Sequence, residues 1–269
     1  MSKEFKILFF GDIVGRPGRE AIAKFLGDNQ EQYSDCFKIA NVENASHGFG
    51  LTKKNHDELI EWGINCMTSG NHIWDKKDIF TFIGESNVLI RPLNYHPSAP
   101  GVGYRIFDDK LIVVNLLGKT FMQISECPFK ALDNLICELS ESMDLSDKII
   151  FVDFHAEASA EKVCFAKYAA SLGVSAVLGT HTHVQTADSR ILNERCAFIT
   201  DAGFCGAKDS VIGMDYEVSL RRFITSIPER FDVASDTERV IDACLLTFDY
   251  KSGAAKKIER LNFEVELNQ

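Results

Sequence analysis

The sequence predicts an α/β fold built around a largely parallel sheet. Apolar runs of strand length recur along the chain, and segments with helical spacing separate several of them. Buried parallel strands have such continuous apolar sequences because both faces of their sheet are covered. Polar or titratable residues follow several of these runs, where the carboxyl ends of parallel strands would bring them together.

The first part of the chain alternates strands and helices. Ile22, Phe25 and Leu26 share one helical face, and Thr52 has the side chain of a helix N-cap. The predicted elements are a strand over residues 5–13, a helix over 19–33, a strand over 37–42, a helix from Thr52 to about residue 62, an apolar approach over 62–67, a helix start at 75–78, a short strand over 88–92 and a hairpin over 103–117 that turns at Asp108-Asp109.

The second part continues this alternation and ends in antiparallel strands. Leu132, Leu135, Ile136 and Leu139 have helical spacing. The predicted elements are a helix over residues 129–143, a strand over 148–154, a helix over 158–172, strands over 174–179 and 196–200, and a closing antiparallel pair over 239–250 and 257–266 around Ser252-Gly253.

Size and composition are compatible with a large core. The chain has 269 residues, of which 45% are hydrophobic, and it contains no repeat, low-complexity tract or linker. We therefore expect a single domain over residues 1–269. The formal net charge of −10 argues against general nucleic-acid binding, which needs a basic face.

Neither a membrane span nor a secretion signal is expected. No uninterrupted run of about 18 apolar residues occurs, and the N-terminus leads directly into the strand-like residues 5–10 without a signal-peptide pattern. The eight cysteines are scattered and form no C-x-x-C pair, which indicates reduced thiols. We therefore expect a cytoplasmic protein.

Each chemically interesting residue also has an ordinary structural explanation when it is taken alone. Asp12 can cap a turn, Gly70-Asn71 is a common turn pair, and His155 can be a hydrogen-bonded core histidine. His181-x-His183 is more informative, because two imidazoles at the end of a buried strand are costly unless they bind something. The recurrence of such residues after separate apolar runs favours one common site.

The residue types in this set favour a metal centre. Imidazole mixed with carboxylate and amide oxygen suits iron, manganese or zinc, and the set is too large for one ion. Two metals could hold a bridging hydroxide that attacks a phosphoryl group, and His72, next to a ligand, could protonate the leaving oxygen. The candidate metal ligands are Asp12, Glu43, Asn44, Asn71, His155, His181 and His183.

The same residues lie in motifs that resemble the calcineurin-like metallophosphoesterases, and more closely their YmdB-type bacterial subgroup. The resemblance covers nearly the whole chain. Its motifs are Gly11-Asp12-Ile13-Val14-Gly15, Glu43-Asn44-Ala45, Asn71-His72-x-Trp74-Asp75-Lys76-Lys77, Asp153-Phe154-His155-Ala156-Glu157, and the run from Gly179 to Asp188 that contains His181 and His183.

The resemblance implies a sandwich of mixed β-sheets flanked by helices, and it implies a role for each candidate. One metal would be held by Asp12, Glu43, Asn44 and His183, and the other by Glu43, Asn71, His155 and His181. The superfamily's usual Asp-x-His is absent, because Val14 stands in place of that histidine. The subgroup shares this departure, and it is associated with a di-iron centre and with hydrolysis of 2',3'-cyclic nucleotides.

We therefore expect a phosphodiesterase that opens 2',3'-cyclic nucleotides such as 2',3'-cAMP, with His72 as proton donor. Iron is the cofactor that the resemblance favours, with manganese and zinc as alternatives, and the resemblance also favours a homo-oligomer. Two rival hypotheses keep the metal site: a phosphatase or phosphodiesterase acting on another phosphate ester, and a metal-containing regulatory binding protein without turnover. The sequence identifies no substrate-binding residues.

Overall fold

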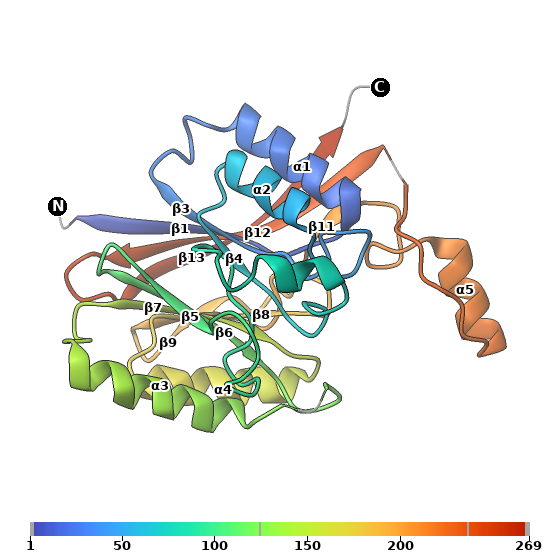
Figure 1. Ribbon diagram of the computed structural model, residues 1–269. Coiled ribbons are helices and arrows are strands. Elements are labelled where there is room, and N and C mark those ends of the chain that lie inside the picture. The colour runs from blue at the N-terminus through green and yellow to red at the C-terminus, as the bar shows by residue number, and fades with distance from the viewer. Residues whose placement is uncertain (1–2, 124, 236, 267–269) are drawn as a thin grey trace.

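Alternate residues of the first strand enter two different parts of the core. The computed structural model describes residues 3–123, 125–235 and 237–266. In β1 (Glu4–Phe10), Ile7 and Phe9 pack between two sheets, whereas Leu8 and Phe10 pack toward the helices. This period of two is the pattern of a strand that is buried on both faces. Two stacked sheets with helices outside them form the architecture (Figure 1).

The first sheet has seven strands in the order β2-β11-β12-β1-β3-β4, with β13 also paired to β12. β1 and β3 are parallel, and so are β3 and β4, whereas β12 runs antiparallel to β1. Besides β1, its strands are β2 (Asp12–Ile13), β3 (Cys36–Asn41), β4 (Cys66–Thr68), β11 (Phe204–Ala207), β12 (Glu238–Asp249) and β13 (Ala255–Glu266).

The second sheet has six strands in the order β5-β6-β7-β8-β10-β9. Its four central strands, β6, β7, β8 and β10, are parallel, and an antiparallel strand closes each edge. The strands are β5 (Tyr104–Phe107), β6 (Leu111–Leu117), β7 (Ile149–His155), β8 (Ala176–Thr180), β9 (Arg190–Leu192) and β10 (Cys196–Ile199).

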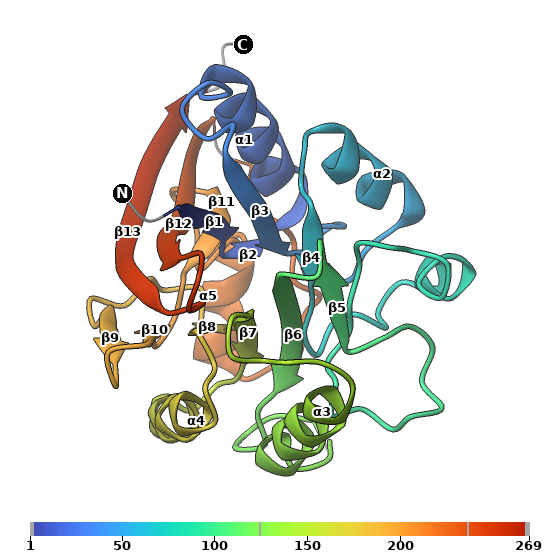
Figure 2. The ribbon, with the colours of Figure 1, turned by 90° about the vertical axis from the view of Figure 1, so that its left-hand side faces the viewer.

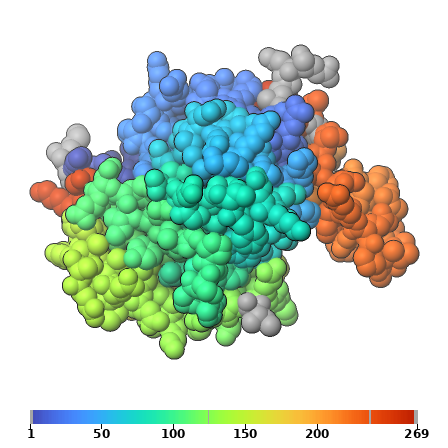
Figure 3. All heavy atoms as spheres, in the orientation of Figure 1, coloured from blue at the N-terminus to red at the C-terminus, as the bar shows by residue number. Residues whose placement is uncertain are grey.

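Helices cover the outer face of each sheet. α1 (Gly15–Asp28) and α2 (Lys53–Glu61) pack on the first sheet, and α3 (Pro128–Ser142) and α4 (Ser159–Ser171) pack on the second (Figures 1 and 2). A 3-10 helix, η1 (Lys77–Thr81), follows β4. α5 (Tyr216–Thr225) instead projects from the body of the molecule, as the orange segment of Figure 3 shows.

The predicted fold class, an α/β sandwich of mixed sheets flanked by helices, is confirmed. No helix within the described residues has the length and apolarity needed to cross a membrane. Because the two sheets share the apolar cluster between them, we propose that residues 1–269 form one domain. Limited proteolysis should then yield no stable half-molecule.

Several predicted elements differ in detail from those observed. The run over residues 5–13 forms two strands, because the chain leaves β12 at Gly11 and pairs with β11 as β2. A Cβ atom at Gly11 would lie 2.1 Å from the carbonyl oxygen of Gly203, so this close crossing requires glycine. The predicted helix over 19–33 begins earlier, at Gly15, and ends at Asp28.

The prediction of a strand over residues 88–92 is wrong. Only Leu89 forms an isolated bridge, to Met67, and the run ends at Pro92, which has no N–H to continue a ladder. The hairpin at Asp108-Asp109 and the closing pair β12–β13 are confirmed. β9, β11 and α5 are additional elements that the sequence patterns did not predict.

Candidate metal centre

The carboxyl ends of strands from both sheets meet at one place. Asp12 begins β2, one residue beyond the end of β1, and Glu43-Asn44 follows β3. Asn71-His72 follows β4, His155 is the last residue of β7, and the His181-x-His183 pair follows β8. The topology therefore brings together residues that are far apart in the chain, as the parallel-strand argument predicts.

Three potential ligand atoms converge on Nε2 of His155. Asn71 Oδ1 and His181 Nδ1 each lie 3.0 Å from it. Glu43 Oε1 lies 3.1 Å away. The ligand atoms of Glu43, His155 and His181 all lie within 4.8 Å of one another. Carboxylate, amide and imidazole groups therefore occupy a volume in which one cation could contact all of them.

A second group of donors lies beside the first. His183 Nε2 is 3.9 Å from Asp12 Oδ1 and 3.1 Å from Asn44 Nδ2. Asn44 Nδ2 also lies 3.3 Å from Glu43 Oε1, so the Glu43 carboxylate is adjacent to both groups. Asp12 Oδ1 is 3.8 Å from His155 Nδ1. The two groups correspond to the two ligand sets that the resemblance implies, with Glu43 between them.

Each of the three clustered histidines has one ring nitrogen engaged by a partner outside the cluster. His155 Nδ1 lies 2.9 Å from Thr180 Oγ1, and the Thr180 hydroxyl donates to Asp153. His181 Nε2 lies 3.1 Å from Glu157. His183 Nδ1 lies 2.8 Å from the carbonyl oxygen of Ile212. Such outer hydrogen bonds fix ring orientation, and they leave the other nitrogen of each ring facing the cluster.

Charges inside the cluster shift several pKa values in opposite directions. Burial raises the pKa of Asp12. Burial also disfavours ionised Glu43, but His155 and the His72 N–H outweigh it and lower the Glu43 pKa to about 2. Burial opposes a charged His155, yet the Glu43 carboxylate raises its pKa to about 9. Burial and the nearby charge of His155 lower the pKa of His181 to about 3. Such strongly perturbed groups are typical of functional sites.

The residues fit a bound cation by an independent test of hydrogen bonding. Within the described residues, two buried oxygens of this site, Asp12 Oδ1 and Asn44 Oδ1, have no hydrogen-bond partner. Buried oxygens without partners are costly, and a metal ion would satisfy them. Gly70 permits the tight arrangement, because a Cβ atom there would lie 2.3 Å from Glu43 Oε2 and 2.5 Å from His155 Nε2.

The backbone that presents His181 and His183 is held in an unusual conformation. His181 has φ of 104° and His183 has φ of 63°, both in the region that non-glycine residues seldom adopt. A buried ion pair supports this turn. Lys162 Nζ lies 2.7 Å from Asp201 Oδ2, and the same carboxylate oxygen accepts from Thr182 N. Lys162 also donates to the carbonyl oxygen of Thr180.

His72 lies at the edge of the cluster. Its backbone N–H donates to Glu43 Oε2 at 2.9 Å, and its Nδ1 lies 2.8 Å from Asp75 Oδ2. The side chain is 28% exposed and contacts the edge of the Phe49 ring. Within the described part of the chain, Nε2 of His72 has no recorded partner. The ring is therefore oriented by a carboxylate and has one nitrogen available to a ligand.

A cavity of about 350 Å³ opens over this cluster. His72, Glu157, His181 and His183 line its polar side. Its other side is apolar and comes largely from the segment that contains α5. The apolar lining residues are Phe49, Val211, Ile212, Met214, Phe223 and Phe231.

A family model described as YmdB-like protein matches residues 8–261. The chain belongs to the YmdB-like family. It is similar to a Bacillus subtilis protein named 2',3'-cyclic-nucleotide 2'-phosphodiesterase, with 42% identity over 259 residues that cover 95% of this chain and 96% of that protein. The predicted resemblance to the YmdB-type subgroup is therefore confirmed.

Two solved structures resemble this YmdB-like chain over nearly its full length. A Mycoplasma pneumoniae protein described as a novel phosphatase is 34% identical, with a TM-score of 0.89 and coverage of 99% of this chain and 95% of its own. A hypothetical protein from Thermus thermophilus is 36% identical, with a TM-score of 0.87 and coverage of 97% of this chain and 99% of its own.

The structure brings all eight predicted site residues of this YmdB-like chain together, although their roles stay predictions. Sequence reasoning assigned no role to the outer partners Asp75 and Glu157, which follow His72 and His155 by three and two positions. Their closeness in sequence to His72 and His155 is the signal that could have identified them. His56, which lies outside the cluster, is buried and lies 2.8 Å from Ser86 Oγ.

Proposed function

We propose that this protein is a dinuclear-metal phosphodiesterase that hydrolyses 2',3'-cyclic nucleotides. One observation carries the proposal: two adjacent groups of carboxylate, amide and imidazole donors share Glu43 and include two buried oxygens without partners. A hydrolase acting on phosphoric esters agrees with the names of the relatives. The cyclic substrate comes from the Bacillus subtilis relative, which is named for it.

The two donor groups would hold one metal ion each. Asp12, Asn44 and His183 would bind the first, Asn71, His155 and His181 the second, and Glu43 both. When bound, the ions would supply Lewis-acid stabilisation of the phosphate and an activated water. The mixed oxygen and nitrogen donors suit iron, which we propose as the native metal, and they also suit manganese or zinc.

His72 would donate a proton to the departing ribose oxygen. Its Nδ1 is held by Asp75, which fixes the orientation of the ring, and the residue lines the cavity. The Glu43 carboxylate positions the same residue through its backbone N–H. One backbone hydrogen bond thereby links His72 to the candidate metal ligands.

The apolar side of the cavity favours a nucleoside over a small alkyl phosphate. Phe49, Phe223 and Phe231 offer aromatic faces and edges on which a base can stack, about 1–3 kcal/mol per stacked base. The phosphate would occupy the polar side of the same cavity. A substrate with an aromatic base at one end and a phosphate at the other matches this lining.

A substrate comparison tests the proposed reaction. Metal-reconstituted protein should hydrolyse 2',3'-cAMP with a higher kcat/KM than p-nitrophenyl phosphate, a simple phosphomonoester. The reverse order would favour a phosphatase acting on another ester. Tight binding of nucleotides with no turnover of any ester would favour a regulatory binding protein.

We further propose a cytoplasmic location and a homo-oligomeric state. All eight cysteines are free thiols, which fits a reducing compartment. Exposed apolar residues on and near α5 that do not line the cavity, such as Ile224 and Ile227, offer a surface for self-association. Sedimentation analysis of the protein with and without Ile227→Glu would test the oligomer.

A further inference from the structure

A second cavity, lined by arginines, adjoins the metal-site cavity. Its volume is about 480 Å³, and none of the proposed metal ligands lines it. Phe231 lines both cavities, and one loop serves both, because His47 faces the second cavity and Phe49 faces the first. The lining residues that carry charge or an imidazole are Arg16, Glu20, His47, Arg230, Asp232 and Arg239.

The positive charges of this cavity are only partly compensated. Glu20 is shared by two arginines, since its carboxylate lies 2.5 Å from Arg16 Nε and 3.8 Å from Arg239. Asp232 is exposed at the rim. Within the described residues, Arg230 has no recorded ion pair or hydrogen bond. An arginine-rich cavity is unusual in a chain whose net charge is −10, and it favours a small anion.

Two further features of the lining, a buried arginine and a helix N-terminus, favour negative charge in this cavity. Arg239 is 8% exposed, and its buried Nε has no hydrogen-bond partner within the described residues. The N-terminus of α1 lies at the same cavity through Arg16 and Pro17, and Val14 gives that helix no side-chain cap. A bound anion would interact favourably with both the helix end and the guanidinium groups.

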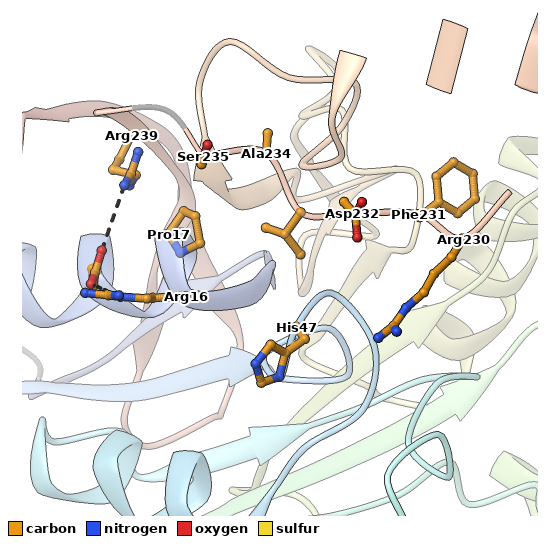
Figure 4. Close-up of a pocket in the computed structure, with 11 residues that line it drawn as sticks. Arg16, Pro17, His47, Arg230, Phe231, Asp232, Ala234, Ser235 and Arg239 are labelled. Carbon is orange, nitrogen blue, oxygen red and sulfur yellow. Dashed lines mark hydrogen bonds and ion pairs between the residues drawn. The ribbon is translucent and has the colours of Figure 1, made fainter. Parts of the chain in front are cut away.

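Figure 4 shows how the side chains lie around this opening. Arg230 extends from the 230–235 segment toward the loop that bears His47, whereas the Arg16 guanidinium lies beside Glu20 on α1. The planar guanidinium of Arg230 can donate two hydrogen bonds to phosphate oxygens, and Arg16 adds positive charge at the other end of the cavity. His47 adds a ring N–H from the same loop that follows Glu43-Asn44.

We propose that this cavity binds a phosphate on the 5' side of the nucleotide whose cyclic phosphate lies at the metal centre. The proposal rests on the proposed function. In a 2',3'-cyclic nucleotide, the cyclic phosphate and the 5' carbon lie at opposite ends of the ribose. A nucleoside in the first cavity can therefore present its 5' phosphate to the adjoining arginines. The preferred substrate would then be an oligonucleotide that ends in a 2',3'-cyclic phosphate.

Binding of two product-like probes tests the phosphate subsite without depending on turnover. Calorimetry with metal-loaded protein should show that adenosine 3',5'-bisphosphate binds about tenfold more tightly than 3'-AMP, the gain expected for a charge-assisted contact. Arg16→Gln combined with Arg230→Gln should bring the ratio close to one. Both side chains are exposed, so this double variant should fold. Arg221→Gln is the matched control, because Arg221 pairs with Glu229 and lines neither cavity.

Equal affinities for the two probes in the wild-type protein would overturn the proposal, and so would a ratio that survives the double substitution. A kinetic experiment then tests whether the 5' phosphate in this cavity belongs to an oligonucleotide. A dinucleotide with a terminal 2',3'-cyclic phosphate should exceed 2',3'-cAMP in kcat/KM, and the double variant should lose this preference. Absence of turnover for every cyclic phosphate, with the binding ratio intact, would refute the proposed reaction and leave the phosphate subsite supported.

Discussion

Gly70 is the position where a single added carbon should disrupt the metal centre. A Cβ atom there would lie 2.3 Å from Glu43 Oε2 and 2.5 Å from His155 Nε2. Restoring ordinary contact at 3.4 Å requires a movement of about 1 Å by buried groups that have little room to move. Gly70 does not have a positive φ, so alanine adds no backbone strain and the effect is steric.

For Gly70→Ala, we expect metal affinity to fall by about 10–100-fold, the range for changes that displace ligands indirectly. Turnover at saturating metal should fall by about 100-fold, because a misplacement of about 1 Å has effects of that size. Calorimetric titration with metal measures the change in affinity, and circular dichroism checks that the variant is folded. Gly84→Ala is the control, since a Cβ atom at Gly84 has no neighbour within 4 Å. Wild-type metal affinity in a folded Gly70→Ala protein would refute the assigned geometry.

Three other predictions concern the proton donor, the base-binding wall and pH. His72→Ala should lower kcat by about 10²–10⁴-fold while both metals stay bound; metal analysis of the purified variant that shows loss of metal would contradict the donor role. Phe223→Ala should raise the KM for 2',3'-cAMP about tenfold, through loss of stacking. Ile224→Ala on the same helix should not, because Ile224 does not line the cavity, and equal effects of the two substitutions would contradict a base contact. Burial lowers the pKa of His155, but the Glu43 carboxylate outweighs burial and raises it to about 9. The imidazole of His155 is therefore protonated below pH 9 in the metal-free protein, and it releases that proton when a metal binds. Metal affinity should therefore rise with pH up to about 9, and calorimetry in buffers of different ionisation enthalpy should detect more proton release at pH 7 than at pH 9.5. Equal release at both values would contradict this assignment.

Much of the fold could be predicted because its strands are long apolar runs. β1, β3, β7 and β8 are buried on both faces, so their sequences identify them without knowledge of their neighbours. The candidate site was predictable for a related reason. His155 and Glu43 each stand after such a run, and parallel topology places the ends of these runs together.

The missed elements depend on contacts that are distant in sequence. β11 has four residues and forms because it pairs with β2 and β12. α5 is capped by Asp215 but keeps Phe223 and Ile224 exposed, so its apolar residues do not mark one buried face. The apolar wall of the cavity exists because the segment that contains α5 lies beside the metal centre. No local sequence motif predicts that position.

The ring orientations in the metal centre were equally beyond sequence reasoning. His183 is oriented by the carbonyl oxygen of Ile212, a backbone atom that any residue type could provide. His155 is oriented through Thr180 and Asp153, whose hydroxyl and carboxylate are buried by tertiary packing. Residue types at strand ends predict which ligands are available, whereas tertiary contacts decide which ring nitrogen faces inward.

The most direct test of the central claim is turnover of 2',3'-cAMP measured against added metal, with Glu43→Gln assayed in parallel. Glu43 lies between the two donor groups, so Glu43→Gln should remove the negative charge that they share and one of its two carboxylate oxygens. We expect turnover that saturates at two metal ions per chain and is absent from the Glu43→Gln protein. Two ions bound per chain without hydrolysis of 2',3'-cAMP, or undiminished hydrolysis by Glu43→Gln, would contradict the proposed dinuclear phosphodiesterase.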